Sequence, residues 1–225
     1  MDVTRYQRQA LLPAIGAAGQ QRLTTSAVLI IGCGALGATA ADLLARAGVG
    51  FLRLVDRDVV DKTNLQRQTL YDEQDVDLPK AEAAAGRLRR VNSDIQIDPI
   101  VSEANPETID DLIRFNDRHV DLIIDGSDNI ETRYLINDAS IAWKIPWIYG
   151  GCVATEGRCM VIRPGVTPCL RCIFSGTLSD ADATTCDTAG ILGPVATVVA
   201  SLQATAAIQL LTGNANAIPR GLTHF

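Results

Sequence analysis

The chain of 225 residues is long enough for one α/β domain with a substantial buried core. Its 20 basic and 26 acidic residues give a net charge of −6, which argues against a general affinity for nucleic acids or anionic membranes. Six irregularly spaced cysteines do not form a disulfide framework, and the N-terminal segment lacks the apolar core of a signal peptide, so we expect a cytoplasmic protein.

Strand and helix patterns alternate along the first two thirds of the chain. Apolar or alternating runs predict strands at residues 27–32, 51–56, 94–101, 120–129 and 146–151. Segments with helical spacing and capping residues lie between them, at residues 35–50, 79–92, 105–116 and 131–144. The alternation predicts an α/β, Rossmann-like doubly wound fold, with a mostly parallel sheet and helices on both faces.

The alternation stops after residue 151. Residues 156–165 have the pattern of one strand of a hairpin, which predicts a C-terminal antiparallel extension. Residues 169–190 show no periodicity and are rich in Ser, Thr, Asp and Gly, so we expect a mobile loop. Residues 189–213 carry no charged side chain, and their many small residues favour a buried core helix starting near Pro194 over a membrane span.

A Gly-x-Gly-x-x-Gly turn, formed by Gly32, Gly34 and Gly37, joins the first predicted strand to the first predicted helix. Glycine lets the backbone approach a phosphate, and the helix N-terminus supplies unpaired amide donors. Asp56 ends the second strand, where a carboxylate can accept hydrogen bonds from two ribose hydroxyls. A nucleotide site is therefore favoured over a ligand-free turn, and NAD and ATP fit these residues equally well.

The residues after Asp56 distinguish the two nucleotides. An NAD-dependent dehydrogenase needs only Asp56, whereas this chain adds Asn64, Arg67 and Lys80 downstream of it. Two cations near one sheet edge favour a ligand with more phosphate charge than NAD carries. Either Arg67 or Lys80 alone could be an ordinary solvated surface charge, but this explanation is weaker when both follow a nucleotide-binding turn.

Together these motifs resemble those of the ThiF/MoeB/HesA adenylyltransferases, relatives of the ubiquitin-activating enzymes. The resemblance covers nearly the whole chain, in order. It rests on the segments "RYQRQ", "GCGALG", "RAGVG", "LVDRDVVDKTNLQRQTLY", "LPKAEAA", "DGSDNIETRYLIN", "PCLRC", "TCDTAGILGPV" and "SLQATAAIQLL". The glycine turn alone is a weak signal, whereas "NLQRQ", "SDN" with the downstream Arg133, and the cysteine pair are together highly specific.

The resemblance implies ATP-dependent adenylation of the C-terminal glycine carboxylate of a ubiquitin-like sulfur carrier protein, with release of pyrophosphate. The carrier would end in Gly-Gly, be of the ThiS or MoaD type, and serve thiamine or molybdopterin synthesis. A cysteine desulfurase or rhodanese is a candidate sulfur donor. A homodimer is also implied, because Arg8 is similar to the family's N-terminal arginine that reaches the neighbouring subunit's ATP site.

The same resemblance implies roles for individual residues: Asp56 would hold the ATP ribose, and Asp128 would place Mg²⁺. The candidate nucleotide-binding residues are Gly32, Gly34, Ala35, Gly37, Asp56, Asp58, Asn64, Arg67, Gln68, Lys80, Asp128 and Asn129. The candidate catalytic residues are Arg8, Asn64, Arg67, Lys80, Asp128 and Cys186. Ala35 stands where many relatives have glycine, and we expect it to be tolerated unless the position needs a positive φ.

The cysteines raise a separate question. Cys169 and Cys172 have the spacing of half a tetrahedral zinc site, and the resemblance implies a second pair near the C-terminus. The sequence stops at Phe225 before such a pair, so either it is truncated, which we expect, or zinc has been lost, with His224 as a candidate third ligand. A redox pair is less favoured. Cys186 stands where some family members link covalently to the carrier and others do not need the cysteine.

Several alternatives stay open. The same chemistry could act on a peptide or on a modified RNA base, although the acidic net charge argues mildly against RNA. The glycine turn alone also suits an NAD-dependent oxidoreductase. A catalytically idle partner subunit is disfavoured, because Arg67, Lys80 and Asp128 are all present. We expect residues 1–225 to form a single adenylyltransferase domain that lacks the family's C-terminal hairpin and second cysteine pair.

Overall fold

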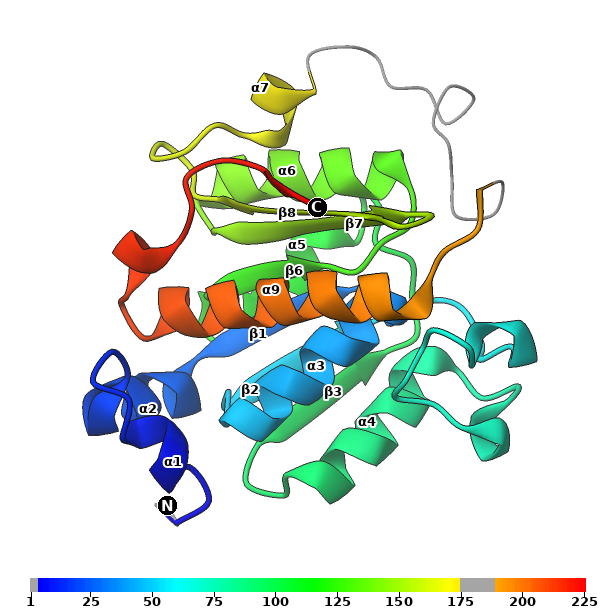
Figure 1. The fold of residues 1–225 in the computed structure, drawn as a ribbon, viewed down its shortest axis with the longest axis horizontal. Coiled ribbons are helices and arrows are strands. Elements are labelled where there is room, and N and C mark those ends of the chain that lie inside the picture. The colour runs from blue at the N-terminus through cyan, green and yellow to red at the C-terminus, as the bar shows by residue number, and fades with distance from the viewer. Residues whose placement is uncertain (1–3, 175–188) are drawn as a thin grey trace.

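One mixed sheet runs through the residues that the computed structural model describes, which are 4–174 and 189–225. Within them, seven strands lie in the order β3-β2-β1-β6-β7-β8-β9 (Figure 1). They are β1 Ala27–Ile31, β2 Phe51–Val55, β3 Gln96–Ile100, β6 Leu122–Asp125, β7 Trp147–Val153, β8 Glu156–Ile162 and β9 Thr223–His224. Parallel pairings join β3 through to β7, and β8 and β9 pair antiparallel. The predicted Rossmann-like sheet with its antiparallel extension is confirmed.

Helices cover both faces of this sheet (Figure 1). On one face, α3, α4 and α9 share an apolar core with the strands. On the other face, α5 and α6 form a second core. The helices and helical turns of the described residues are α1 Gln7–Ala10, α2 Gly16–Thr25, α3 Ala35–Ala47, η1 Lys62–Asn64, η2 Glu73–Asp75, α4 Lys80–Val91, α5 Ile109–Ile113, α6 Ile130–Trp143, α7 Leu170–Ile173, α9 Gly193–Leu211 and η3 Ala215–Ala217.

Strand β1 shows how one sequence serves two cores. All five of its residues are buried. Val28 and Ile30 contribute to the core beneath α3 and α9, whereas Ala27, Leu29 and Ile31 contribute to the core beneath α5 and α6. Successive side chains of a strand point to opposite faces, so a parallel strand covered on both sides is apolar at every position.

Helix α9 is the charge-free helix that the sequence predicts. It begins at Gly193, with Pro194 in its first turn, and packs along α3 and against β7 and β8 (Figure 1). Length and composition alone would also allow it to cross a membrane. However, Val195, Val199 and Gln203 are buried within the molecule, which makes α9 a core helix, as predicted.

One predicted helix is shorter than expected. The pattern at residues 105–116 predicts a single helix, but the structure has only Ile109–Ile113, followed by a small hairpin. That hairpin consists of β4 Arg114–Phe115 and β5 Arg118–His119. Asn116 reverses the chain with a φ of +52°. Phe115 packs on Phe51 with ring centroids 4.0 Å apart, so burial of this ring favours the hairpin over another helical turn.

Candidate functional site

A cavity of about 1050 Å³ opens at the carboxyl edge of the sheet, where the strand order reverses between β1 and β6. Doubly wound sheets bind their ligands at this position. The cavity is lined by most of the predicted nucleotide-binding residues, namely Gly32, Gly34, Ala35, Asp56, Asp58, Asn64, Arg67, Gln68, Lys80, Asp128 and Asn129. Gly37 does not line the cavity, because it packs closely beneath the carbonyl oxygen of Gly32.

The glycine turn forms the floor of the cavity. Gly32 has a φ of +90°, and a Cβ atom there would lie 2.5 Å from the carbonyl oxygen of Gly126. Gly34 precedes α3 and leaves the first amides of that helix without a side-chain cap. Uncapped amides at a helix N-terminus attract phosphate. Ala35, the first residue of α3, does not have a positive φ, so its methyl group requires no strained backbone.

Asp56 is held in a fixed orientation at the end of β2. Its Oδ2 atom accepts a hydrogen bond from the backbone amide of Cys33 at 2.7 Å, and its Oδ1 atom accepts one from the amide of Asp58 at 2.8 Å. Burial raises the pKa of Asp56, against the opposing effects of these two hydrogen bonds and of Lys80. Each carboxylate oxygen keeps a free lone pair, so the side chain can still accept hydrogen bonds from a ribose.

The predicted phosphate-binding residues follow β2 along the chain. Lys80 is only 8% exposed, and its Nζ atom lies 3.1 Å from Oδ2 of Asp58. Asn64 completes a capping box around η1 by accepting a hydrogen bond from the amide of Asp61. Arg67 is half-buried and donates to a backbone carbonyl one turn before it. The ammonium, amide and guanidinium groups therefore line one side of the same cavity.

Gln68 has an unpaired amide oxygen at the cavity floor. The residue is 4% exposed, and its Oε1 atom has no hydrogen-bond partner among the described residues. Its Nε2 atom lies 3.8 Å from the position that a Cβ atom would take at Gly34. Buried polar groups normally have partners, so an unpaired one beside the glycine turn fits a site whose ligand supplies the missing contact. The residues present therefore fit a nucleotide.

The start of α9 supports the loop that carries Arg67. A Cβ atom at Gly193 would lie 2.8 Å from the carbonyl oxygen of Gln66 and 3.4 Å from Cα of Arg67. Only a residue without a side chain allows the two backbones to approach this closely. Ile191, two residues earlier, also lines the cavity.

Asp128 lies in the turn between β6 and α6. It is exposed and lines the cavity. Its neighbour Asn129 caps α6 by accepting a hydrogen bond from the amide of Thr132 at 2.8 Å, which occupies the amide oxygen. Mg²⁺ typically binds one or two carboxylates together with phosphate oxygens and water, and Asp128 suits that role. No three His, Cys, Asp or Glu side chains of the described residues gather as a metal site, so the nucleotide would have to supply other ligands.

Sequence reasoning missed the second half of the cavity. This half is lined by α6 and by the β7–β8 hairpin, and it includes Arg133, Tyr149, Gly151, Glu156 and Arg158. Arg133 lies just downstream of "SDN" in the motif described above, and that motif could have placed it at the site. Tyr149 and Arg158 carry no such signal, because only the pairing of the two strands, with Gly151 opposite Arg158, brings them to the cavity.

Arg8 lies outside the cavity of its own chain. Two neighbours anchor its short helix α1. The Tyr6 hydroxyl accepts a hydrogen bond from Nδ2 of Asn92 at 2.7 Å, and Gln9 donates to the carbonyl oxygen of Ala47 at 3.0 Å. Arg8 itself is exposed. A contribution of Arg8 to the site of a neighbouring subunit stays a prediction.

The cysteine pair also lies outside the cavity. The Sγ atoms of Cys169 and Cys172 are 3.6 Å apart. Burial opposes ionisation of Cys169, but hydrogen bonds from Cys172, Arg171 and Asn137 together outweigh it and lower the pKa of the Cys169 thiol. His224 does not join the pair: its Nε2 atom lies 3.2 Å from Oε2 of Glu156, and the described residues contain no group of three metal-binding side chains. Cys186 lies outside the described residues.

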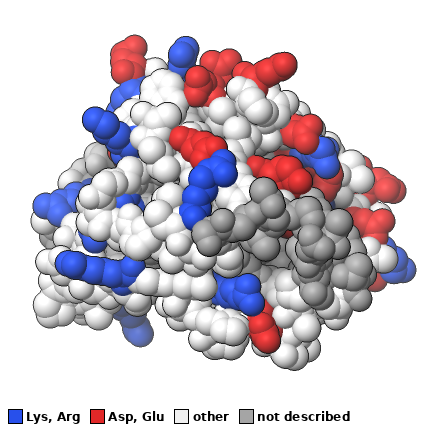
Figure 2. All heavy atoms as spheres, turned by 90° about the horizontal axis from the view of Figure 1, so that it is seen from above, with Lys and Arg blue, Asp and Glu red and all other residues white. Residues whose placement is uncertain are grey.

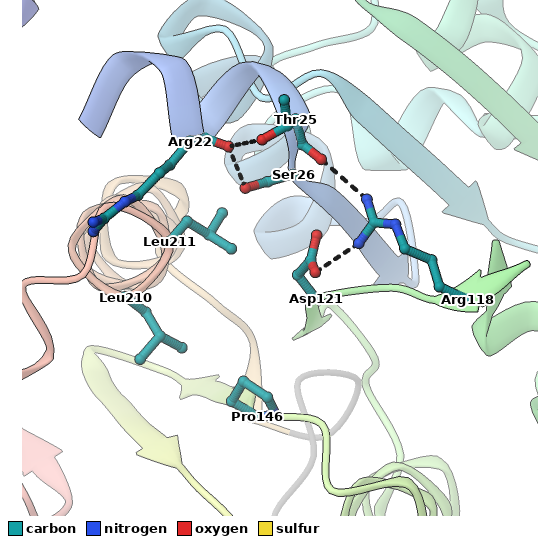
Figure 3. Close-up of a pocket in the computed structure, with 8 residues that line it drawn as sticks. All are labelled: Arg22, Thr25, Ser26, Arg118, Asp121, Pro146, Leu210 and Leu211. Carbon is teal, nitrogen blue, oxygen red and sulfur yellow. Dashed lines mark hydrogen bonds and ion pairs between the residues drawn. The ribbon is translucent and has the colours of Figure 1, made fainter. Parts of the chain in front are cut away.

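A second hollow of about 660 Å³ lies at the amino edge of the sheet (Figure 3). Its charged groups all bind within the chain. Arg118 donates to Oδ1 of Asp121 at 2.7 Å and to the carbonyl oxygen of Thr25 at 3.0 Å, and Arg22 donates to the carbonyl oxygen of Thr212 at 2.8 Å. No predicted site residue lines this hollow.

Comparison with known proteins adds independent findings. The model of the ThiF family matches residues 6–225. The chain is 46% identical to the sulfur carrier protein ThiS adenylyltransferase of Bacillus subtilis, over 93% of this chain and 61% of that protein. It is 37% identical to the SAMP-activating enzyme E1 of Haloferax volcanii, over 96% of this chain and 78% of that protein.

A solved structure has a fold similar to that of this chain. The crystal structure of E. coli MccB with AMPCPP and MccA has a TM-score of 0.79 to this chain and 26% sequence identity, and it covers 95% of this chain. This chain covers 65% of MccB. The chain therefore spans less than two thirds of both the B. subtilis and the E. coli protein.

Proposed function

Because the chain belongs to the ThiF family, we propose that it adenylates the C-terminal glycine carboxylate of a ubiquitin-like sulfur carrier protein of the ThiS or MoaD type. It uses ATP, releases pyrophosphate and serves sulfur transfer for thiamine or molybdopterin synthesis. Two relatives support this proposal, since one is named for adenylating ThiS and the other for activating SAMP. The observation that carries it is one cavity in which a glycine turn and two cations face a second, hairpin-lined half.

The nucleotide would occupy the half of the cavity between β1 and β2. There, Asp56 would accept hydrogen bonds from the ribose hydroxyls, and the N-terminus of α3 would bind phosphate oxygens. Arg67 and Lys80 would contact the remaining phosphate oxygens. Fixed cations offset the repulsion that an attacking carboxylate meets as it approaches a polyanionic nucleotide.

The chemical step is a displacement at the α-phosphorus. An oxygen of the glycine carboxylate forms a new bond to that phosphorus, the bond from the phosphorus to the bridging oxygen breaks, and pyrophosphate leaves with the electron pair. A carboxylate is already ionised at neutral pH, so no general base is required. The two histidines, His119 and His224, do not line the cavity. Rate acceleration would therefore come from orientation and charge.

Two metals enter the proposal differently. Asp128 would hold Mg²⁺, and the ion would neutralise charge on the departing pyrophosphate. Cys169 and Cys172 supply only two of the four ligands of a structural zinc site. A second cysteine pair beyond Phe225, and with it the binding of Zn²⁺, stays a prediction, as does the organisation of residues 1–225 as a single adenylyltransferase domain.

The partners follow from the same activity. We expect a homodimer in which Arg8 completes the neighbouring site, a cysteine desulfurase or rhodanese as sulfur donor, and a cytoplasmic location. A covalent role for Cys186 is also a prediction. We expect no nucleic-acid partner, since the net charge of −6 argues against a general affinity for nucleic acids. The face shown in Figure 2 carries both acidic and basic side chains.

A peptide acceptor is the second candidate. The structural similarity to MccB, which was solved with MccA rather than with a sulfur carrier, keeps this candidate open. The sulfur carrier is favoured because identity is higher to the two enzymes named for their carriers, at 46% and 37%, than to MccB, at 26%.

ATP–pyrophosphate exchange tests the proposal. We expect exchange only when a carrier ending in Gly-Gly is added, because only the acyl-adenylate step can be reversed by labelled pyrophosphate. A carrier whose terminal glycine is extended by one alanine is the matched control and should give no exchange. Absence of exchange with every sulfur carrier, together with tight NAD(H) binding, would instead favour the oxidoreductase alternative.

A further inference from the structure

A buried ion pair lies directly beneath the turn that carries Asp128. Asp125, the last residue of β6, has no exposed side-chain surface, and the Arg133 side chain, in the first turns of α6, is 18% exposed. Nε of Arg133 lies 3.4 Å from Oδ2 of Asp125. Charged groups are costly to bury, so a pair placed here needs a reason beyond fold stability.

The carboxylate of Asp125 holds the backbone on both sides of the cavity. Its Oδ1 atom accepts hydrogen bonds from the amide of Ser127 at 2.9 Å and from the Ser127 hydroxyl at 2.6 Å. Its Oδ2 atom accepts from the amide of Gly150, in β7, at 3.4 Å. Ser127 directly precedes Asp128, and Gly150 directly follows Tyr149, which lines the second half of the cavity.

The guanidinium of Arg133 holds the same two residues by their carbonyl groups. Its Nη2 atom donates to the carbonyl oxygen of Ser127 at 3.0 Å and to that of Gly150 at 3.4 Å. Its Cζ atom lies 5.4 Å from the centre of the Tyr149 ring, which is a cation–π contact. The ion pair therefore fixes the amide and the carbonyl of both Ser127 and Gly150.

Helix α9 completes this arrangement. Nε2 of Gln203 donates to the carbonyl oxygen of Asp125 at 2.7 Å and to that of Ile148 at 3.2 Å. Four elements, β6, β7, α6 and α9, thus meet at one network beneath the cavity. A network of this kind orients a neighbouring ligand residue in the same way that outer-shell partners orient metal ligands.

We propose that Asp125 and Arg133 are positioning residues, which hold the turn 126–129 so that the Asp128 carboxylate faces the phosphates at a fixed place. This inference rests on the proposed function only for the identity of the ligand. The geometry itself, in which one ion pair fixes both peptide groups beside Asp128, does not depend on it. Arg133 acts through the backbone of Ser127, and Asp125 acts through the same residue and through Gly150.

The test compares Arg133→Lys with the wild type. Lysine keeps the charge but loses the planar fork that reaches two carbonyl groups, so the turn should loosen while the pair stays neutralised. We expect the free Mg²⁺ concentration for half-maximal pyrophosphate exchange to rise by about tenfold, whereas binding of ATP without Mg²⁺ changes little. A role in fold stability alone would not move the Mg²⁺ dependence.

The matched control is Arg118→Lys. Arg118 also joins a carboxylate and a backbone carbonyl, but it does so at the opposite edge of the sheet (Figure 3). The control should leave the Mg²⁺ dependence unchanged. An Arg133→Lys enzyme with normal Mg²⁺ dependence and a reduced maximal rate would show that the guanidinium acts on the substrate directly, and it would overturn the inference.

A second measurement needs no substrate. Deuterium uptake at the amides of residues 126–129, followed by mass spectrometry in the ligand-free protein, should rise in Arg133→Lys and in Asp125→Asn but not in Arg118→Lys. Unchanged uptake in both variants would also overturn the inference. If the wild type gave no exchange, the proposed function would fail, and this measurement would still decide whether the pair positions the turn.

Discussion

Asp56 has a carboxylate that two backbone amides already orient. Burial raises its pKa above the ordinary value of 3.8, against the opposing hydrogen bonds from Asp58 and Cys33 and the charge of Lys80. It therefore takes up a proton at a higher pH than an exposed aspartate does. Because ribose hydroxyls donate to the ionised form, we expect adenosine affinity to fall as the pH falls, starting above the range in which a free carboxyl group titrates.

Calorimetric titration with adenosine over a series of pH values measures this effect, since adenosine carries no phosphate. Asp56→Asn is the matched control because it keeps the shape of the side chain and does not ionise. The variant should bind weakly with little dependence on pH. If the wild type and the variant had the same pH profile, Asp56 would not be the group that binds the ribose.

At the scale of elements, two glycines in different surroundings give opposite predictions. Gly32 directly follows β1 and has a positive φ and no room for a Cβ atom, whereas Gly86 lies inside α4 with nothing within 4 Å of the Cβ position. We expect Gly32→Ala to lower the free energy of unfolding by about 2 kcal/mol or more, because the turn must distort. Gly86→Ala should raise it by up to about 1 kcal/mol, because alanine favours a helix interior.

Urea unfolding of the two variants measures both changes. Both variants replace glycine with alanine, so a difference between their free energies of unfolding reflects the conformation and surroundings of the backbone at the two positions. A Gly32→Ala protein as stable as the wild type would mean that the turn between β1 and α3 accommodates a side chain, which its close contact with Gly126 does not allow.

Elements were predictable where the local pattern and the tertiary environment agree. The uniformly apolar β1 and the charge-free α9 need no distant partner to be recognised. The hairpin after α5 could not be predicted, because Phe115 leaves the helical pattern to pack on Phe51, more than sixty residues earlier. Helix α2 has little amphipathic pattern, and its glycines and alanines give no strong signal.

The residues of the candidate site likewise fall into a group that the sequence predicts and a group that it does not. Asp56, Asn64, Arg67 and Lys80 lie close together in the sequence, so one motif could predict their meeting, and the cavity contains all four. The second half of the cavity depends on the register of the β7–β8 hairpin, which no short motif encodes. Arg133 was visible in a motif, but its bonds to Ser127 and Gly150 follow from the packing of α6 on two strands.

At the scale of the whole molecule, Arg8 offers a test of assembly. The anchored helix α1 presents Arg8 to solvent rather than to its own cavity. If two chains share sites, a mixed dimer of Arg8→Ala and Asp128→Ala chains has one site in which both residues are intact. We expect each variant alone to lack pyrophosphate exchange, and the co-expressed mixture, isolated through two different tags, to regain part of it.

The mixture needs one control. Native mass spectrometry must show that mixed dimers have formed, and a mixture of wild-type and Asp128→Ala chains sets the activity expected of a dimer with a single working site. Mixed dimers without recovered exchange would contradict a shared site and would leave Arg8 as a surface residue.

The close backbone contact at Gly193 has a consequence for protein engineering. Anyone who wishes to engineer this chain near the start of α9 could graft a foreign segment there. Such a graft must keep glycine at position 193, because any side chain there would push against Gln66 and displace Arg67. A library that randomises position 193 would therefore contain members in which Arg67 is displaced, although Gly193 itself does not line the cavity.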